Sequence, residues 1–284
     1  MRMPRGVLGA LSVVALWSII EAPARAQTWV LVPGALSEVS VGNSITIWGV
    51  NSSNNIYEYS NASSWIKLPG QLTYVTVAPD GVAWGINSST QQVWEYQSST
   101  NTWNHIQGNR TSIKVGSRDV VWTLDSTGKV FRFNPAIQAW DHITGTLTQL
   151  SVASDGVVVG LNGGELFFFD PMTQQFVGVG GVGLSQVAAG FGGAVFALDT
   201  SGNIYQFDIR SQRLILIPGN LSQIAVGSNH AIYGVNSAQT AYQYDIQMGH
   251  WTALLGAALT QIAVASDGTV WGLSATGHIY YLQP

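Results

Sequence analysis

The chain contains no cysteine and little charge. Its 284 residues include 11 basic and 15 acidic ones, so charged residues make up only 9% of the sequence, whereas 11% are aromatic. The lack of cysteine excludes a disulfide scaffold. A disordered chain would be rich in charge and poor in aromatic residues, and a long helical protein would be rich in Glu, Lys, Leu and Ala. What remains is a compact, sheet-rich protein with an uncharged polar surface.

The first 26 residues differ from the rest. Two arginines precede an apolar run over residues 7–20, and small residues two apart follow at Ala24 and Ala26. This pattern is typical of a secretory signal peptide, cut here before Gln27. An uncleaved membrane anchor is the alternative, but about 14 apolar residues fall short of the roughly 20 that span a bilayer. We expect a signal peptide over 1–26 and a secreted or periplasmic protein without membrane insertion.

The remaining residues, 27–284, have eight basic and 14 acidic side chains, which gives a net charge of −6. Binding to nucleic acid through counterion release needs many Lys and Arg on one face. Eight dispersed basic residues therefore argue against nucleic acid as a partner.

After residue 26 the sequence consists of seven repeats of one unit. Leading apolar residues recur 36 to 38 positions apart, and a glycine follows each of them five positions later. These leading residues are Trp29, Trp65, Trp103, Trp140, Phe176, Leu214 and Trp251. Such self-similarity at a fixed period is the sequence signature of a repeat architecture.

Each unit has a second apolar column at its centre, four residues past the start of a turn such as Asp80-Gly81. The members of this column are Trp48, Trp84, Trp122, Val159, Phe196, Tyr233 and Trp271. The next residue is glycine in five units, and Asn or Asp closes the segment in six. An aromatic segment such as Ile56-Tyr57-Glu58-Tyr59 ends the unit.

Every unit thus holds four short runs rich in Val, Ile, Trp, Tyr and Phe, separated by Gly, Asn, Asp and Ser. These are strand and hairpin signals, and the short connections require antiparallel pairing. Four short antiparallel strands in each of seven units predict an all-β protein, a seven-bladed β-propeller. Residues 27–284 then form a single domain.

The order of strands predicts how the ring closes. If the segments beginning at Leu36, Leu72 and their equivalents are innermost, each leading Trp run is the outermost strand of the preceding blade. Residues 28–32 would then complete the blade built by residues 259–283. In the alternative, each blade starts at its own Trp and side chains alone close the ring.

The positions that recur in each unit together resemble the tectonin repeat, most clearly in residues 65–102 and 251–284. The shared pattern runs Trp-x-x-Ile/Leu-x-Gly, Leu-x-x-Ile-x-Val, Asp-Gly-x-x-Trp-Gly-Leu/Ile-Asn and Ile-Tyr-x-Tyr. Units four to six depart from it most, because Val159 and Phe196 replace the central Trp. The resemblance implies a propeller that binds glycans, as secreted tectonin-type lectins do, or that binds proteins. It speaks against catalysis, although fold alone does not decide function.

Motifs for catalysis or cofactor binding are absent from the sequence. It has no Gly-x-Ser-x-Gly, no His-Glu-x-x-His and no phosphate-binding Gly-Lys-Ser/Thr. His105 and His142 share one column, but neither has a second metal ligand nearby in the sequence, and zinc needs three or four. Asp80, Asp155 and Asp267 suit turns better than acid–base work. We predict no catalytic residue, no metal and no cofactor.

Candidate ligand contacts are the central aromatic side chains and the Asn or Asp three positions later, because aromatic faces stack on pyranose rings and amides bind hydroxyls. They are Trp48, Asn51, Trp84, Asn87, Trp122, Asp125, Tyr233, Asn236 and Trp271. A second interpretation is open for each residue. A repeated aromatic side chain can belong to the core between blades, and Asn or Asp at the end of a strand can cap a turn.

The predicted function is multivalent binding of glycans or glycoconjugates on a cell surface, since a repeated unit provides several similar sites. The alternatives are a propeller that binds proteins without sugar affinity and, third, an exported propeller enzyme.

Overall fold

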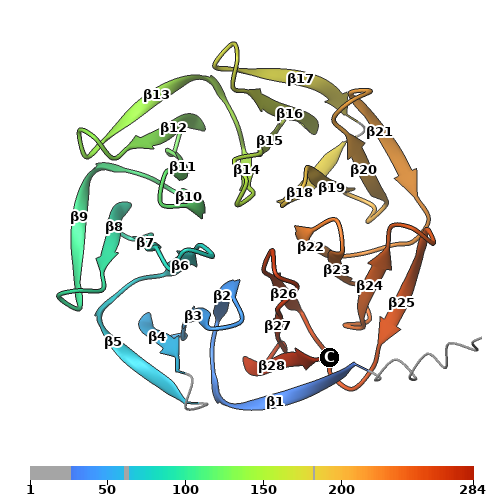
Figure 1. Cartoon of the computed structure of the whole chain (residues 1–284), viewed down its shortest axis with the longest axis horizontal. Coiled ribbons are helices and arrows are strands. Elements are labelled where there is room, and N and C mark those ends of the chain that lie inside the picture. The colour runs from blue at the N-terminus through green and yellow to red at the C-terminus, as the bar shows by residue number, and fades with distance from the viewer. Residues whose placement is uncertain (1–26, 61–63, 182) are drawn as a thin grey trace, which may run out of the picture.

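The computed structural model describes residues 27–60, 64–181 and 183–284. Within these ranges all the regular secondary structure is β-strand. The strands form seven four-stranded antiparallel sheets arranged round a central axis (Figure 1). The predicted seven-bladed, all-β propeller is confirmed. The predicted signal peptide over 1–26 lies outside the described residues. In the described ranges no helix has the length and apolar character needed to cross a membrane.

Each blade contributes one strand to each of four concentric layers. The innermost strands are β2 (Glu38–Asn43), β6 (Tyr74–Val77), β10 (Ser112–Ser117), β14 (Gln149–Val152), β18 (Leu184–Gly190), β22 (Gln223–Ser228) and β26 (Gln261–Val264). The second strands are β3 (Thr46–Val50), β7 (Ala83–Asn87), β11 (Val120–Leu124), β15 (Val158–Asn162), β19 (Ala194–Asp199), β23 (Ala231–Val235) and β27 (Val270–Leu273). We number the blades 1 to 7 in this order.

The two outer layers follow the same order. The third strands are β4 (Asn55–Tyr59), β8 (Gln92–Gln97), β12 (Lys129–Asn134), β16 (Glu165–Asp170), β20 (Ile204–Asp208), β24 (Ala241–Asp245) and β28 (His278–Gln283). The outermost strands are β5 (Trp65–Gln71), β9 (Thr102–Asn109), β13 (Ala139–Thr146), β17 (Gln175–Gly181), β21 (Arg213–Ile217), β25 (His250–Leu254) and, in blade 7, β1 (Thr28–Ala35).

The ring closes through a mixed blade, as predicted. Strand β1 pairs antiparallel with β28, from Thr28 opposite Gln283 to Val32 opposite Ile279, and the sheet order is β1-β28-β27-β26. Figure 1 shows the blue first strand lying along the red last one. The alternative, in which each blade starts at its own Trp, is wrong, because every leading Trp run completes the blade before it.

The inner strands start slightly later than the sequence predicted. In blades 1 and 2 they begin at Glu38 and Tyr74, two residues after Leu36 and Leu72. The reason is that these leucines bond to the preceding blade. The Leu36 N–H donates to the carbonyl of Gly277 in blade 7 at 3.1 Å, and the Leu72 N–H donates to that of Asn54 in blade 1 at 3.0 Å.

This blade-to-blade hydrogen bond occurs at all seven junctions. The other five run from Arg110 to Gln91, Leu147 to Gly128, Leu184 to Gly164, Leu221 to Gly202 and Leu259 to Gln239. All seven acceptor residues have positive φ, between 56° and 82°. The left-handed turn between the second and third strands thus presents its carbonyl to the next unit. We call the end of the ring that carries these turns the crossover face.

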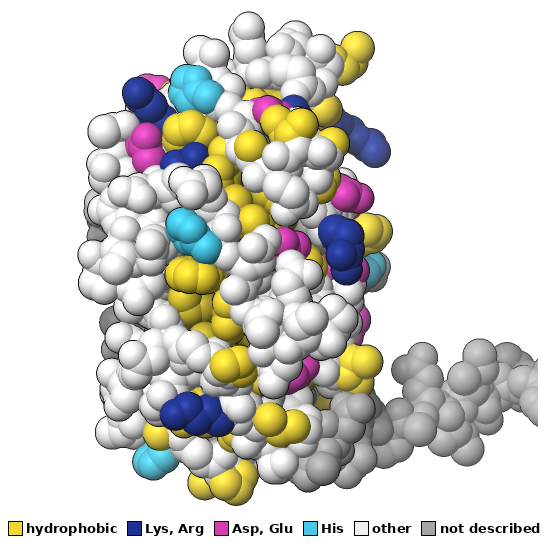
Figure 2. Space-filling view, turned by 90° about the vertical axis from the view of Figure 1, so that its left-hand side faces the viewer, with side chains coloured by type: hydrophobic (Ala, Val, Ile, Leu, Met, Phe, Trp, Pro, Cys, Tyr) yellow, Lys and Arg dark blue, Asp and Glu magenta, His cyan; other side chains and the backbone are white. Residues whose placement is uncertain are grey.

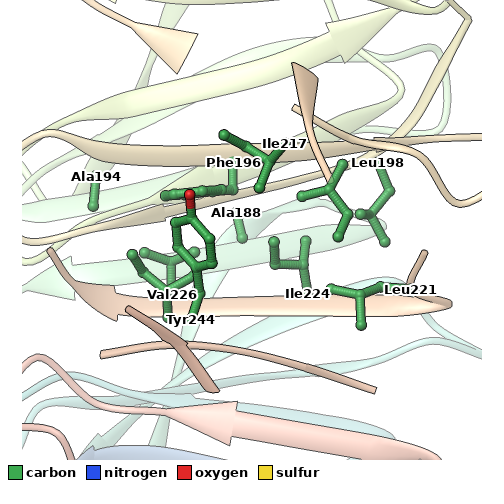
Figure 3. Packing of buried hydrophobic residues seen from close by; sticks show 11 residues of the cluster. Ala188, Ala194, Phe196, Leu198, Ile217, Leu221, Ile224, Val226 and Tyr244 are labelled. Carbon is green, nitrogen blue, oxygen red and sulfur yellow. The ribbon is translucent and has the colours of Figure 1, made fainter. Parts of the chain in front are cut away.

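Aromatic side chains fill the space between blades. The central residue of one blade packs against the third strand of the next, as with Trp48 and Tyr96, whose ring centroids lie 4.9 Å apart. Trp271 makes the same contact with Tyr59 across the closure, also at 4.9 Å. Figure 3 shows the equivalent pair between blades 5 and 6, Phe196 and Tyr244, among buried aliphatic side chains.

The small residue after the central aromatic leaves room for a leucine of the same blade. A Cβ atom on Gly49 would stand 2.5 Å from Leu36 Cδ1, far inside van der Waals contact. Blade 3 has another solution, since Thr123 replaces the glycine and Arg110 replaces the leucine. The Arg110 Nε–H donates to Thr123 Oγ1 at 3.1 Å, and its guanidinium carbon lies 3.8 Å from the ring centroid of Phe131.

We predict that Arg110 and Thr123 are energetically coupled. Arg110→Leu alone forces a leucine against the Thr123 side chain, and Thr123→Gly alone removes a partner of a buried guanidinium. Each should cost about 1–3 kcal/mol. The double variant restores the leucine–glycine pair of blade 1 and should cost less than the sum of the two. Urea unfolding of the four proteins measures the coupling energy, and strict additivity would contradict the prediction.

Candidate functional site

The five aromatic side chains predicted to contact a ligand are buried. Trp48, Trp84, Trp122, Tyr233 and Trp271 are only 0–4% exposed. Each lies on the second strand of its blade and points at the next blade, where it packs against side chains of the third and outermost strands. In this arrangement none of the five side chains exposes a ring face on which a sugar could stack. Their burial favours the core interpretation that the sequence left open.

The four Asn and Asp side chains predicted beside them cap the turns of the crossover face. Asn51 Oδ1 accepts from the N–H groups of Ser53 and Asn55 at 3.1 and 3.0 Å. Asp125 Oδ1 accepts from the N–H groups of Thr127 and Lys129 in the same way. Asn87 and Asn236 each accept from one backbone N–H, that of Ser89 and that of Thr240. This agrees with the turn-capping interpretation. It occupies only one oxygen, however, so the second polar atom of each side chain is left for other partners.

That second atom points toward an aromatic side chain on the third strand. Asn51 Nδ2 lies 3.4 Å from the Tyr57 hydroxyl, and Asn236 Nδ2 lies 3.3 Å from the Tyr242 hydroxyl. In blade 5 the Tyr205 hydroxyl donates to Asp199 Oδ2 at 3.3 Å. In these three blades the polar residue therefore stands beside an aromatic residue six positions later in the chain.

This outer aromatic residue is present in all seven blades. Its members are Tyr57, Trp94, Phe131, Phe167, Tyr205, Tyr242 and Tyr280, and all are partly exposed. Its neighbours at the end of the second strand are Asn51, Asn87, Asp125, Asn162, Asp199, Asn236 and Ser274, also partly exposed. The signal was in the sequence, because this position is aromatic in every unit while the central one is not. Within the sequence alone, however, an aromatic segment at the end of the unit indicates only a strand.

Between blades 3 and 4 the pair lies in a crease of the outer wall, where the outermost strand of one blade meets the third and outermost strands of the next. We use the name crease for the equivalent junction between each two neighbouring blades. Figure 2 shows apolar side chains gathered along the wall between uncharged polar surfaces, with few charges. The crease between blades 3 and 4 encloses about 320 Å³. Its lining includes Thr144, Thr146, Asn162, Phe167, Gln175 and Phe176.

The lining of this crease suits a neutral, hydroxylated ligand. Two aromatic rings provide an apolar surface, and amide and hydroxyl groups surround it. Asn162 Nδ2 donates to Thr146 Oγ1 at 3.3 Å, which holds the amide across the crease. A further space of about 500 Å³ adjoins it on the crossover face, between Asp125 and Asn162.

The creases are not equivalent, and blade 3 differs most. Arg110 covers the face of Phe131, so that crease is partly filled by the protein's own guanidinium. Burial lowers the pKa of Arg110, while Asp125 raises it. Burial would raise the pKa of Asp125, but hydrogen bonds from Thr127 and Lys129 bring it below its ordinary value. Asp125 is therefore ionised at neutral pH, whereas the equivalent Asn162 in blade 4 is uncharged.

The histidines do not form a metal site in the described part of the chain, where no three potential ligands converge. His105 lies against Trp94, with ring centroids 4.9 Å apart, and His142 lies against Phe131 at 5.3 Å. Both come from the outermost strand and border the outer aromatic residue. They extend the polar edge of two creases.

Fold and crease together define a repeat propeller, and comparison with known proteins identifies its family. The family model of the Tectonin domain matches residues 21–175 and 167–284, so the chain belongs to the Tectonin domain family. No curated protein matches the sequence.

Solved structures share the fold at low sequence identity. A streptogramin B lyase is 12% identical, with a TM-score of 0.71 over 90% of this chain and 97% of the lyase. YCF48, solved with a D1 peptide, is 13% identical, with a TM-score of 0.71 over 94% and 100%. A chain of the mitotic checkpoint complex is 12% identical, with a TM-score of 0.69 over 99% of each. These likenesses concern the fold alone.

We predict opposite outcomes for two tryptophans only ten residues apart. Trp84→Ala should cost about 3–5 kcal/mol of unfolding free energy, because it opens a cavity between blades 2 and 3. Trp94→Ala removes a partly exposed ring and should cost much less. Thermal and urea unfolding measure both. An equal loss of stability in the two variants would contradict the assignment of Trp84 to the core and Trp94 to the crease.

Proposed function

We propose that this protein is a secreted, lectin-like propeller that binds glycans in the creases of its outer wall. One observation carries the proposal: a partly exposed aromatic residue on the third strand and a partly exposed Asn, Asp or Ser at the end of the second strand recur in all seven blades, and in blades 1, 5 and 6 the two side chains are in hydrogen-bond contact. Inter-blade packing already uses the central aromatic and the leading apolar residue. The outer aromatic residue is partly exposed in every blade, as the leading residue is, but it stands on the third strand, next to the strand that ends in the Asn, Asp or Ser.

The chemistry of the crease between blades 3 and 4 fits a sugar. The C–H face of a pyranose is apolar and stacks on an aromatic ring such as Phe167. Its hydroxyls need donors and acceptors, which Asn162, Gln175 and the neighbouring threonines supply. These are amide and hydroxyl groups, which bind a hydroxylated ligand without providing a general base, so we propose binding rather than catalysis.

Repetition of the site supports multivalent recognition. A single shallow crease of about 320 Å³ gives weak binding, but several creases on one rigid ring engage a glycan-coated surface together. The second contact then forms at a high effective concentration, so avidity exceeds the affinity of one site. The low charge of the wall is consistent with neutral sugars as ligands.

Export is part of the proposal. The charged start, short apolar run and small residues over 1–26 are the pattern of a secretory signal peptide. A glycan-binding ring that acts on a cell surface needs to leave the cell that makes it.

A glycan array probed with the protein starting at Gln27 tests the proposed function. We expect binding to a restricted set of sugars, retained in chelator because no metal ligands converge in the described residues. Silence across neutral, methylated, amino and lipopolysaccharide sugars would remove the lectin proposal. Loss of binding in chelator would contradict the predicted independence from metals.

Substitutions at Asn162 then locate the site with the sugar that the array identifies. Asn162→Asp keeps the size of the side chain and matches Asp125 in blade 3, but it replaces the amide group that donates to Thr146 with an acceptor. We expect it to weaken sugar binding at this crease about tenfold, the cost of one lost hydrogen bond, with little change in melting temperature. Titration with the free sugar, followed by NMR shifts in blade 4, measures this. Unchanged binding would limit Asn162 to its contact with Thr146 and remove it from the proposed site.

A further inference from the structure

The central channel is lined by three ionisable side chains that have no part in the proposed glycan sites. The channel encloses about 510 Å³ and is lined by the inner strands of all seven blades. Of the residues that line it, the ionisable ones are Glu38, Tyr74 and Lys114. All three come from blades 1 to 3, so one side of the channel is polar and ionisable.

The opposite side of the channel, formed by blades 4 to 7, shows which side chain is sufficient for contact between blades at the position of Glu38. The position occupied by Glu38 in blade 1 is glutamine in blades 4 to 7. Gln186 Oε1 accepts from the Ile224 N–H at 3.0 Å, and Gln223 Oε1 accepts from the Ile262 N–H at 2.7 Å. These glutamines join each blade to the next. A neutral amide is therefore sufficient at this position, and Glu38 is an exception.

Lys114 is a second exception. At its position on the inner strand, the other blades have only Ser, Thr or Ala, for example Ser40 and Ser151. Its Nζ donates to the Tyr74 hydroxyl at 2.6 Å and lies 4.9 Å from the centre of the tyrosine ring. This contact fixes the long side chain in place. No carboxylate among the described residues forms an ion pair with Lys114, which leaves N–H groups of its ammonium free for another acceptor.

The surroundings favour a bound anion over a solvated cation. Next to Lys114 the channel narrows to a space of about 80 Å³, lined by one valine or alanine from each inner strand, including Val115. Burial opposes the charge of Lys114, but Tyr74 raises its pKa above the ordinary value, and Glu38 adds to this effect once it is ionised. Burial raises the pKa of Glu38 to about 8, although Lys114 pulls it down. At neutral pH the channel thus holds one cation and a protonated carboxyl group.

We propose that the wide end of the channel binds a small oxyanion, a carboxylate or a phosphate, between Lys114, Tyr74 and Glu38. Lys114 provides the positive charge and one N–H donor. The Tyr74 hydroxyl accepts from Lys114 and can donate its own proton to the ligand, and the Glu38 carboxyl group donates a second hydrogen bond. The site is independent of the outer creases, since it lies on the axis and uses none of their residues.

Glu38 also predicts how stability depends on pH. The unfolded chain releases this proton near the ordinary pKa of 4.5, whereas the folded protein holds it to about 8. Between these values the folded state binds one more proton, so stability is greatest below pH 4.5 for this group and falls as pH rises. The folding equilibrium constant should drop by up to about tenfold per pH unit. Urea unfolding from pH 5 to 8 measures the slope.

Glu38→Gln is the matched variant, because blades 4 to 7 already carry glutamine at this position. It should flatten the pH dependence of stability between pH 5 and 8. An identical slope in the wild type and in Glu38→Gln would show that Glu38 titrates normally and would remove it from the proposed site.

The binding test titrates the chain with inorganic phosphate and, separately, with acetate at constant ionic strength. Backbone NMR shifts of β6 and β10 report binding. We expect saturable shifts in the wild type, at least tenfold weaker binding in Lys114→Ser, and wild-type behaviour in Lys129→Ser, which removes an exposed lysine. Saturation with only one of the two anions identifies the kind of oxyanion that the channel takes.

The pH dependence of binding provides a second arm that does not require Lys114 to be changed. Wild-type affinity should fall as pH rises through about 8, because ionised Glu38 repels the anion. With acetate, which stays fully ionised throughout, affinity in Glu38→Gln should stay constant over that range. Absence of saturable shifts in the wild type, or equal binding in Lys114→Ser, would overturn the proposal. Neither result depends on whether the outer creases bind sugars.

Discussion

Packing between neighbouring blades is the interaction on which the whole ring depends. A four-stranded sheet with two apolar faces cannot cover either of them alone, so each blade is stable only between two others. The contact repeats a few elements: a central side chain against the third strand of the next blade, a leucine in the space left by a glycine, and a backbone hydrogen bond across the crossover face. These elements recur at the closure between blades 7 and 1, where Leu36 bonds to Gly277 and Trp271 meets Tyr59.

The same packing decides which residues remain for function. In the inner and middle parts of each blade, the side chains pack against the neighbouring sheets. Trp84 is fully buried for this reason. Toward the outside the sheets diverge, and the ring of Phe167 is only partly covered. Neighbouring inner strands are in contact, but those on opposite sides of the axis do not meet, so Glu38 and Lys114 line a channel. Candidate sites therefore occur at the two places where inter-blade packing is incomplete.

Much of the fold could be predicted from the sequence, because its signals are repeated. One copy of the pattern is weak, but the spacing of Trp29, Trp65 and their equivalents fixes seven units, and the order of strands fixes the closure by β1. The site was harder to predict. Trp48 and Tyr57 are both aromatic and both close to Asn51, and no local feature of the sequence says which ring is covered. Burial depends on the neighbouring blade, which lies some 37 residues away in the chain. The pairing of Lys114 with Tyr74 depends on a contact between blades for the same reason.

Strand β1 has one more consequence, which concerns the order of the units. Thr28 stands opposite Gln283, so the two ends of the ring are neighbours in one sheet. The junction between blades 7 and 1 has the same hydrogen bond as the junctions that the chain runs through, and the same aromatic contact as the junction between blades 1 and 2. Geometrically, the ring therefore has no first blade. A gene rearranged to begin at another unit, with the present ends joined by a short linker, would encode the same circle of contacts. Unequal divergence of the blades, such as Arg110 in blade 3, can then accumulate anywhere round the circle without disturbing closure.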